Sequence, residues 1–178
     1  MRRILALRDK AKSIKRTVVL PEGGDKRVVK AASFLAEEGI VNVILLGAEE
    51  EMKELASELS VSLDKVNLVD PAKHDKREEI VNTYYELRKN KGMTFEEAEE
   101  LVLGKLVFYA AVMTRLEMAD GFVAGAVHTT GDVARASIHC LKIDREVGTV
   151  SSSFLIEMEN SPFGEDGLFA FGDCGIIP

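Results

Sequence analysis

One predicted strand-to-helix turn carries the residue types that hold an anion. Thr129 and Thr130 supply two hydroxyl groups beside Gly131, where a helix is expected to begin. The first N–H groups of a helix have no partner inside the helix, and the helix dipole adds to their attraction for negative charge. Arg135 follows one turn later, so free amides, hydroxyls and a guanidinium can converge on one phosphate group. The alternative is that Thr130 or Asp132 only caps the helix while Arg135 faces water.

Three other candidate positions have simpler interpretations. The turn 21–25, Pro-Glu-Gly-Gly-Asp, follows a predicted strand, and its glycines permit close approach of a ligand. It has neither the ending of a phosphate loop nor the dinucleotide-binding spacing, which favours a tight structural turn. Arg88 stands near the carboxyl end of a predicted helix, where a cation is favourable without any further role. His128 is a candidate general acid or base, or a hydrogen-bonding group within its turn.

The two cysteines indicate neither a disulfide framework nor a metal centre. Cys140 and Cys174 lie far apart in no paired motif, and the three histidines are scattered. Cys174 has no basic neighbour and no helix start beside it, so the sequence gives little support for a nucleophile there. Together with the lack of an apolar signal-peptide core, this predicts a reducing, cytoplasmic setting and no bound metal.

Composition and charge exclude several classes of protein. With 46% hydrophobic and 30% charged residues, the chain is typical of globular proteins and unlike disordered, collagen-like or disulfide-stapled chains. No apolar run approaches the ~18 residues that span a bilayer. Residues 1–30 hold ten Lys and Arg against three acids, although the net charge is −7. Interleaved leucines and alanines favour an amphipathic helix over residues 1–16, rather than a nucleic-acid arm or a transit peptide.

The elements that must position these residues alternate between strand and helix. Buried strands are expected at 16–21, 41–47, 65–69 and 121–127. Helices are expected after Asp25 to Gly39, at 48–59, at 75–91, from Thr94 toward Glu117 with a candidate break at Gly104, and after Asp132 through Lys142. Four such alternations predict an α/β fold, a mostly parallel sheet with helices on both faces. Ligands of such sheets bind beyond the carboxyl ends of the strands, where both candidate turns lie.

The pattern changes after Arg145. Segments 148–158 and 167–171 are predicted to be strands, with a turn between them and no helix after them. We therefore expect a first α/β domain at 1–145 and the opening strands of an incomplete second domain at 146–178.

Taken together, the segments resemble phosphotransacetylase, the phosphate acetyl/butyryl transferase family. The matching pieces occur in family order: Val18-Val-Leu-Pro-Glu22 with the helix start after Asp25, Tyr84-Tyr-Glu-Leu-Arg-Lys89, Asp120-Gly-Phe-Val-Ala-Gly125 leading to His128 and Arg135, Ser151-Ser-Ser-Phe154, Phe163-Gly-Glu-Asp-Gly167 and Phe171-Gly-Asp-Cys-Gly175. The resemblance implies reversible acetyl transfer between acetyl phosphate and coenzyme A, in a cleft between two α/β domains like those of the isocitrate and isopropylmalate dehydrogenases. Coenzyme A is then a co-substrate, and no cofactor is bound permanently.

The resemblance also assigns residues. Two of the family's functional arginines fall on Arg88 and Arg135, and Thr129 and Thr130 match its hydroxyl-rich turn. Gly131 stands where some members have a third hydroxyl residue. Ala136 stands where proline is common in the family, and Gly172 stands where alanine is usual. In the family the thiol of coenzyme A attacks the acetyl carbonyl directly, with an aspartate as base and a serine assisting. Both belong to a second half of the family that has no counterpart here, so the general base is expected outside this sequence.

Three functions agree with these features. The first is the amino-terminal part of a phosphotransacetylase, truncated or encoded separately and active only with its other half. The second is a non-catalytic module that binds acetyl phosphate or acetyl-CoA, and the third is a phosphate butyryltransferase. A homodimer or a complementing carboxyl-terminal chain is the expected partner, with no nucleic acid and no membrane.

Overall fold

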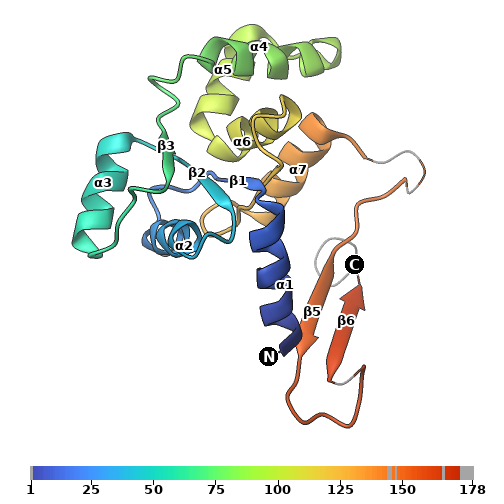
Figure 1. Ribbon diagram of the computed structural model, residues 1–178. Helices are drawn as coiled ribbons and strands as arrows, with labels where there is room; N and C mark the ends of the chain where they lie inside the picture. Colours follow the sequence, from blue (N-terminus) through green and yellow to red (C-terminus); the bar gives the residue numbers. More distant parts are fainter. Residues whose placement is uncertain (1, 144–145, 147, 166, 173–178) are drawn as a thin grey trace. The chain divides into compact units, whose positions relative to one another are not determined.

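The protein was analysed in a computed structural model that describes residues 2–143, 146, 148–165 and 167–172. The chain divides into two compact units. The larger unit is Lys15–Lys142, and the smaller combines Met1–Ile14 with Ile143–Pro178. Figure 1 shows the elements of both.

A four-stranded parallel sheet forms the centre of the larger unit, in the order β3-β2-β1-β4. Its strands are β1 (Thr17–Leu20), β2 (Asn42–Leu46), β3 (Asn67–Val69) and β4 (Gly121–Phe122). In the register, Val19 pairs with Ile44 of β2 and with Phe122 of β4. The predicted fold class, a mostly parallel α/β sheet with helices, is confirmed.

Helices cover both faces of this sheet (Figure 1). The helices are α2 (Lys26–Glu37), α3 (Glu49–Glu58), α4 (Arg77–Arg88) with the short 3-10 turn η1 (Lys89–Lys91), α5 (Phe95–Gly104), α6 (Leu106–Arg115) and α7 (Thr130–Leu141). Because successive side chains of a strand point to opposite faces, Leu20 joins a core with α2 and α3, whereas Val19 joins a second core with α4 to α7.

Two local predictions about the helices are confirmed. The capping box at the start of α5 is present, because the Thr94 hydroxyl accepts from the Glu97 N–H while the Glu97 carboxylate accepts from the Thr94 N–H. The helix predicted toward Glu117 is divided, as expected near Gly104, and Lys105 separates α5 from α6 in an extended conformation.

The strand predicted at 121–127 is wrong in its length. β4 ends at Phe122, and the Val123 N–H makes one more hydrogen bond to the Val19 carbonyl at 2.9 Å. Further along, the N–H groups of Gly125 and Ala126 donate to the carboxylate of Glu22 instead of to a neighbouring strand. The loop therefore leaves the sheet early, and the reason is the site described below.

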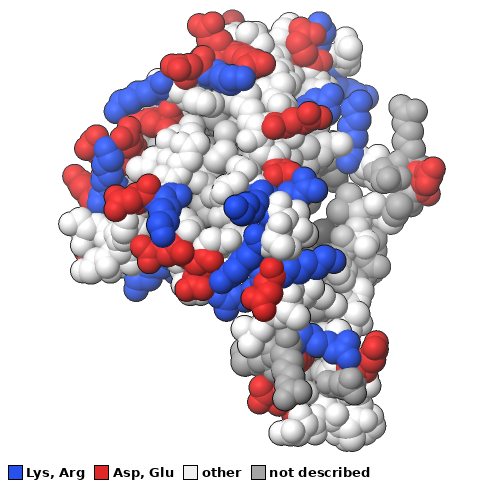
Figure 2. Space-filling model, in the orientation of Figure 1, with Lys and Arg blue, Asp and Glu red and all other residues white. Residues whose placement is uncertain are grey.

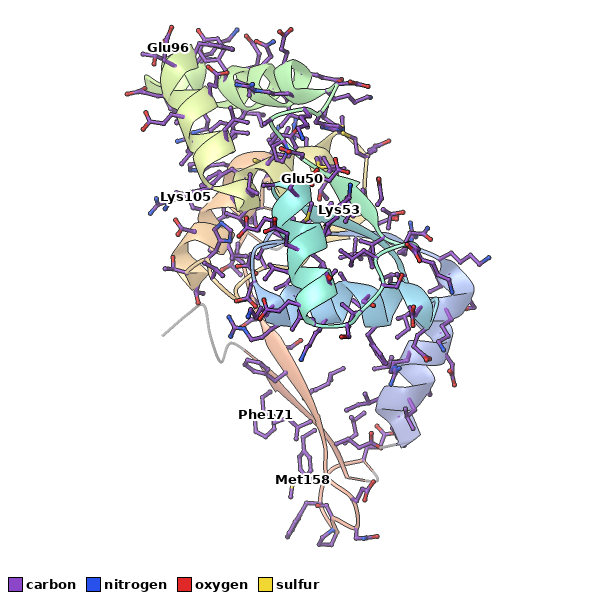
Figure 3. All side chains as sticks on the ribbon, turned by 90° about the vertical axis from the view of Figure 1, so that its left-hand side faces the viewer. Glu50, Lys53, Glu96, Lys105, Met158 and Phe171 are labelled. Carbon is purple, nitrogen blue, oxygen red and sulfur yellow. The ribbon has the colours of Figure 1, made fainter. Side chains whose placement is uncertain are left out.

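The smaller unit contains α1 (Arg2–Ile14) and an antiparallel hairpin of β5 (Ser153–Glu157) and β6 (Leu168–Gly172). The N–H groups of Arg3 and Ile4 donate to the Glu157 carboxylate at 3.1 and 3.2 Å. This grouping places the amino-terminal helix with the hairpin, and the domain boundary expected at residue 145 stays a prediction. Met158 and Phe171, labelled on the hairpin in Figure 3, are about half exposed, at 54% and 47%.

Two features are absent from the described residues. In that part of the chain no helix combines the length and the apolar character needed to cross a membrane. No group of three or more His, Cys, Asp and Glu side chains there is arranged to hold a metal ion. Cys140 is buried, while Cys174 lies outside the described residues.

Candidate functional site

The turn after β1 contains a buried carboxylate, that of Glu22, which is only 6% exposed. It accepts hydrogen bonds from four consecutive backbone N–H groups, those of residues 125–128, at 2.8 to 3.2 Å. His128 Nδ1 lies 2.9 Å from the same carboxylate. A side chain of the first strand-to-helix turn therefore fixes the loop that leads to α7.

The charge of Glu22 is held by these hydrogen bonds. Burial by itself would raise the pKa of this carboxyl group, but the N–H groups of His128, Val127 and Ala126, with the His128 ring, outweigh burial and lower the pKa to about 2. Glu22 is thus ionised at any ordinary pH, and it serves as an internal anion for the loop.

Arg27 also contacts this loop. Its guanidinium donates to the Ala126 carbonyl at 2.7 Å and to the Asp25 carboxylate at 2.7 Å. Asp25 in turn caps α2 by accepting from the Arg27 N–H at 2.8 Å. Residues 22–27 therefore bind the loop in two ways. The Glu22 carboxylate accepts from its backbone N–H groups, and the Arg27 guanidinium donates to its Ala126 carbonyl.

These contacts correct one part of the predicted anion site. The expectation of several free backbone amides before α7 is wrong for residues 125–128, because Glu22 already occupies them. Thr129, rather than Thr130 or Asp132, caps the helix, and its hydroxyl accepts from the Asp132 N–H at 3.1 Å. Thr130 and Gly131 remain exposed in the first turn, where N–H groups lack helical partners.

The two arginines predicted from the sequence lie on two helices, α4 and α7, whose faces are in contact. Arg88 stands one turn after Tyr84 on α4, and Arg135 stands one turn before His139 on α7. The Tyr84 hydroxyl and His139 Nδ1 are 2.8 Å apart, which joins the two faces. Within the described residues, the buried Arg88 Nε has no hydrogen-bond partner. The structure thus gathers Arg88 and Arg135 around one tyrosine–histidine pair.

Electrostatics agree with this placement. Burial lowers the pKa of His139 first, and the positive charges of Arg88 and Arg135 lower it further. For Tyr84, burial raises the pKa to about 12, with the same two arginines opposing the rise. Both guanidinium groups therefore act on the same pair of side chains, and a negatively charged ligand near them would meet two cations.

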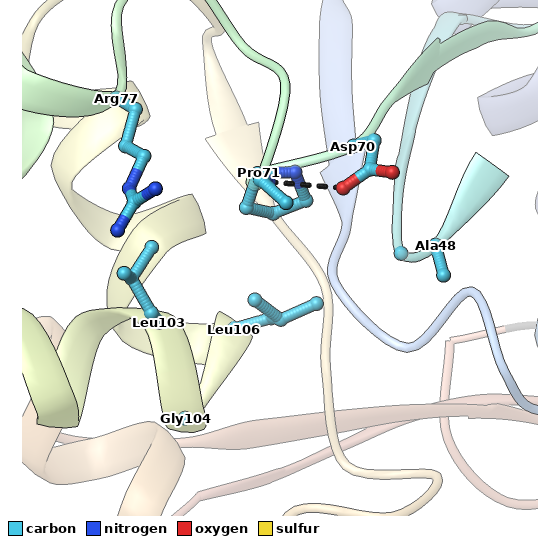
Figure 4. A pocket seen from close by; sticks show the side chains of 9 residues that line it. Ala48, Asp70, Pro71, Arg77, Leu103, Gly104 and Leu106 are labelled. Atoms are coloured by element: carbon cyan, nitrogen blue, oxygen red, sulfur yellow. Dashed lines mark hydrogen bonds between the residues drawn. The ribbon is translucent and has the colours of Figure 1, made fainter.

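Two pockets lie at the carboxyl ends of the strands, where open α/β sheets bind ligands. One, of about 430 Å³, is lined by residues that include Asp70, Arg77 and Leu106 (Figure 4). The other, of about 380 Å³, is lined by residues that include Glu22 and His128. The pockets share a wall at Gly47, Ala48, Gly104 and Leu106. Neither includes Arg88 or Arg135, so the arginine pair is a separate feature of the unit.

The surface charges of this unit are mixed in sign. Figure 2 shows Lys and Arg side chains next to Asp and Glu side chains over its visible face. Several of these side chains form ion pairs. Lys53 pairs with Glu49 on α3 at 2.5 Å, and Lys105 pairs with Asp132 at 2.7 Å. Lys53 and Lys105 are labelled in Figure 3.

Sequence reasoning missed three residues that shape this region. Glu22 was treated only as part of a tight turn, although an acid directly after a buried parallel strand faces the loops at that edge of the sheet. Tyr84 and His139 were not singled out either. Their spacing of four residues from Arg88 and Arg135, on the same helix faces, was the available signal.

The larger unit is thus an α/β fold in which two arginines, Arg88 and Arg135, lie near one tyrosine–histidine pair. The model of the phosphate acetyl/butaryl transferase family matches residues 3–178. This chain belongs to that family.

Two curated relatives and two solved structures illustrate the match. The chain is 39% identical over 175 residues to a phosphate acetyltransferase of Thermoanaerobacterium thermosaccharolyticum, covering 98% of this chain and 52% of that protein. It is 41% identical over 169 residues to that of Acetivibrio thermocellus, covering 95% and 50%. A EutD phosphotransacetylase from Staphylococcus aureus matches with a TM-score of 0.81 at 34% identity, covering 97% of this chain and 50% of that one. A Streptococcus pyogenes phosphotransacetylase matches with a TM-score of 0.86 at 29% identity, covering 97% and 51%.

The chain thus spans about half the length of the curated relatives it matches.

Proposed function

We propose that this chain supplies the phosphate-binding part of a phosphate acetyltransferase, which exchanges an acetyl group between acetyl phosphate and coenzyme A. The observation that carries the proposal is the gathering of Arg88 and Arg135 around the Tyr84–His139 pair. Family membership and several relatives that bear this name support it. A phosphate butyryltransferase would use the same phosphate site and differ only in acyl size.

Two cations suit the chemistry of this reaction. When a thiol attacks the acetyl carbonyl of acetyl phosphate, the leaving phosphate gains negative charge. Guanidinium groups that are already in place stabilise that charge without reorganising. Arg88 and Arg135 would hold the phosphate in both directions of the transfer, with Thr130 and Gly131 exposed at the start of α7 as further donors.

Neither Glu22 nor Cys140 is suited to act as the general base of this reaction. The Glu22 carboxylate, with its pKa of about 2, is far too weak a base for a thiol of pKa ~8.5. Cys140 is buried, and burial raises the pKa of its thiol to about 12. We therefore assign the base to the part of the family that this chain does not match, in keeping with the aspartate and serine that the resemblance implies.

The test is acetyl-CoA formation from acetyl phosphate and coenzyme A, followed by the absorbance of the thioester. We expect the chain alone to bind inorganic phosphate without measurable turnover. Turnover should appear when a polypeptide corresponding to the unmatched half of a relative is added. Turnover by the chain alone would contradict the assignment of the base.

Two arginine variants test the site itself. Arg88→Ala and Arg135→Ala should each weaken phosphate binding at least tenfold, which corresponds to about 1.4 kcal/mol. The control is Lys53→Ala, which removes a cation on α3 that is paired with Glu49. Unchanged phosphate affinity in both arginine variants would remove the proposed site. Phosphate binding that never supports turnover, even with the second polypeptide, would favour the non-catalytic module instead.

A further inference from the structure

We propose that His139 is a third anion-binding residue of the site formed by Arg88 and Arg135, and that a phosphate-bearing ligand draws a proton onto its imidazole ring. The inference rests on the proposed function for the location of the ligand. It goes beyond that function by assigning a new residue and by making ligand binding depend on pH.

Both arginines lie close enough to His139 to influence its charge. His139 shares a face of α7 with Arg135, one turn away, and its Nδ1 lies 2.8 Å from the hydroxyl of Tyr84. Tyr84 shares a face of α4 with Arg88, again one turn away. A ligand that touches both guanidinium groups must therefore approach the helix faces on which this histidine and tyrosine meet.

The groups that face His139 come from three helices. From α4 come Tyr84 and Arg88, and from α7 itself comes Arg135. From α6 comes the Phe108 ring, with its centroid 6.2 Å from that of His139. Within the described residues, the charges that shift this histidine are the two arginines, and no carboxylate opposes them.

Hydrogen bonding sets the tautomer of the ring. Burial keeps the Tyr84 hydroxyl protonated, since its pKa is raised to about 12. The hydroxyl can therefore donate to Nδ1 of neutral His139, which leaves the ring proton on Nε2. On protonation both ring nitrogens carry a proton, and Nδ1 donates to the tyrosine oxygen instead. Either state keeps the Tyr84–His139 contact.

An anion reverses the electrostatic balance at His139. In the free chain, burial and two neighbouring cations favour the neutral ring, which is why the pKa is lowered. A bound dianion offsets the arginine charges, so protonation becomes easier. By linkage, if ligand binding raises the pKa of the histidine, then protonation of the histidine must strengthen ligand binding by the same factor. The affinity for the ligand therefore rises as the pH falls. A rise of one pKa unit corresponds to about a tenfold gain in affinity.

The experiment uses the 178-residue chain with inorganic sulfate, which keeps its two charges over the whole range in which histidine titrates, about pH 5 to 8. Proton NMR follows the three histidine rings with and without saturating sulfate, and His139→Gln identifies the signal. We expect sulfate to raise the pKa of His139 by about one unit. Sulfate should bind about tenfold more tightly at the acidic end of the range in the unaltered chain, and equally at both ends in His139→Gln.

His74→Gln is the matched control. His74 is also paired with a tyrosine, with its Nδ1 2.7 Å from the hydroxyl of Tyr109, but it belongs to no arginine pair. This variant should keep the pH dependence of sulfate binding. If it loses the dependence as completely as His139→Gln does, the effect does not come from His139 and the inference fails.

The outcomes separate the inference from the proposed function. Sulfate that binds equally at both pH values, without moving the pKa of His139, overturns the inference and leaves the arginine site standing. Failure of both sulfate and phosphate to bind at any pH overturns the site and the inference together. If His139→Gln does not fold, His74→Gln and His128→Gln assign the other two signals, and the NMR titration of the unaltered chain still decides the question.

Discussion

In the unit Lys15–Lys142, apolar side chains from both faces of the parallel sheet lie in two buried clusters. In the described part of the smaller unit, the hairpin exposes most of its apolar side chains, among them Phe154, Leu155 and Phe163 at 55%, 51% and 73%. A two-stranded hairpin is marginal by itself in water, whereas a parallel sheet covered on both faces is not. The larger unit has its own core, and the arginine pair lies on it.

This difference in packing indicates which unit can hold functional side chains in fixed positions. Arg88 and Arg135 project from helices whose other faces join a buried core, so their backbone positions are fixed by packing. The hairpin has no comparable support among the described residues, and from Glu146 onward the sequence contains no Lys or Arg. The proposed phosphate-binding role therefore belongs with the larger unit.

The largest expected effect tests the difference in packing. Phe108 is fully buried against Tyr84, so Phe108→Ala should lower the free energy of unfolding by about 3–5 kcal/mol through lost burial and a cavity. Phe171→Ala, on the hairpin, should change it by less than about 0.5 kcal/mol. Urea denaturation monitored by circular dichroism measures both. Equal losses for the two variants would abolish the distinction between the units.

An intermediate effect tests the internal anion. Glu22→Gln turns one acceptor into a donor facing backbone N–H groups, and we expect a loss of about 2–3 kcal/mol at neutral pH. Because the pKa of Glu22 is lowered from 4.5 to about 2, its stabilisation is fully present above pH 4.5 and is lost as the pH falls through about 2. The difference between variant and unaltered chain should therefore shrink on acidification.

The control for that measurement is Glu51→Gln. Glu51 lines the same pocket but is exposed, so this variant should stay within about 0.5 kcal/mol of the unaltered chain at each pH. A stability gap for Glu22→Gln that stays constant down to pH 2 would show that the carboxylate charge does not hold the loop.

The smallest expected effect concerns the turn that carries Glu22. The Gly23 N–H donates to the Leu46 carbonyl at 2.9 Å, and a Cβ at Gly23 would lie only 2.5 Å from that oxygen. Gly23→Ala should therefore destabilise the chain by about 1–2 kcal/mol, because backbone must shift. Gly104→Ala meets no atom within 4 Å and should be neutral or slightly stabilising. Thermal unfolding midpoints compare the two, and equal midpoints would mean that the turn can relax.

Much of the fold could be predicted because its signals are local. Strands such as 41–47 are apolar runs between turn residues, and the Thr94–Glu97 capping box needs only a spacing of three. The early end of β4 could not be predicted in this way. It depends on Glu22, about a hundred positions earlier, taking the N–H groups of residues 125–128 away from the sheet.

The candidate site shows the same limit. The resemblance placed Arg88 and Arg135 among the functional residues, but by itself the local sequence allowed a cation at a helix end and an arginine in water. Their convergence depends on how α4 and α7 pack, and on a tyrosine and a histidine that meet only in the folded chain. No spacing along the sequence encodes a contact across 55 positions.

The buried carboxylate of Glu22 also has a kinetic meaning. A phosphate-binding loop that is ordered only by its ligand must close after the encounter, which slows association and reduces affinity by the entropy of ordering. Here the loop before α7 is already ordered by a negative charge that the chain itself carries. A ligand reaching the adjacent helix start would find a rigid surface, so its association should be governed by diffusion and by the attraction of the arginines.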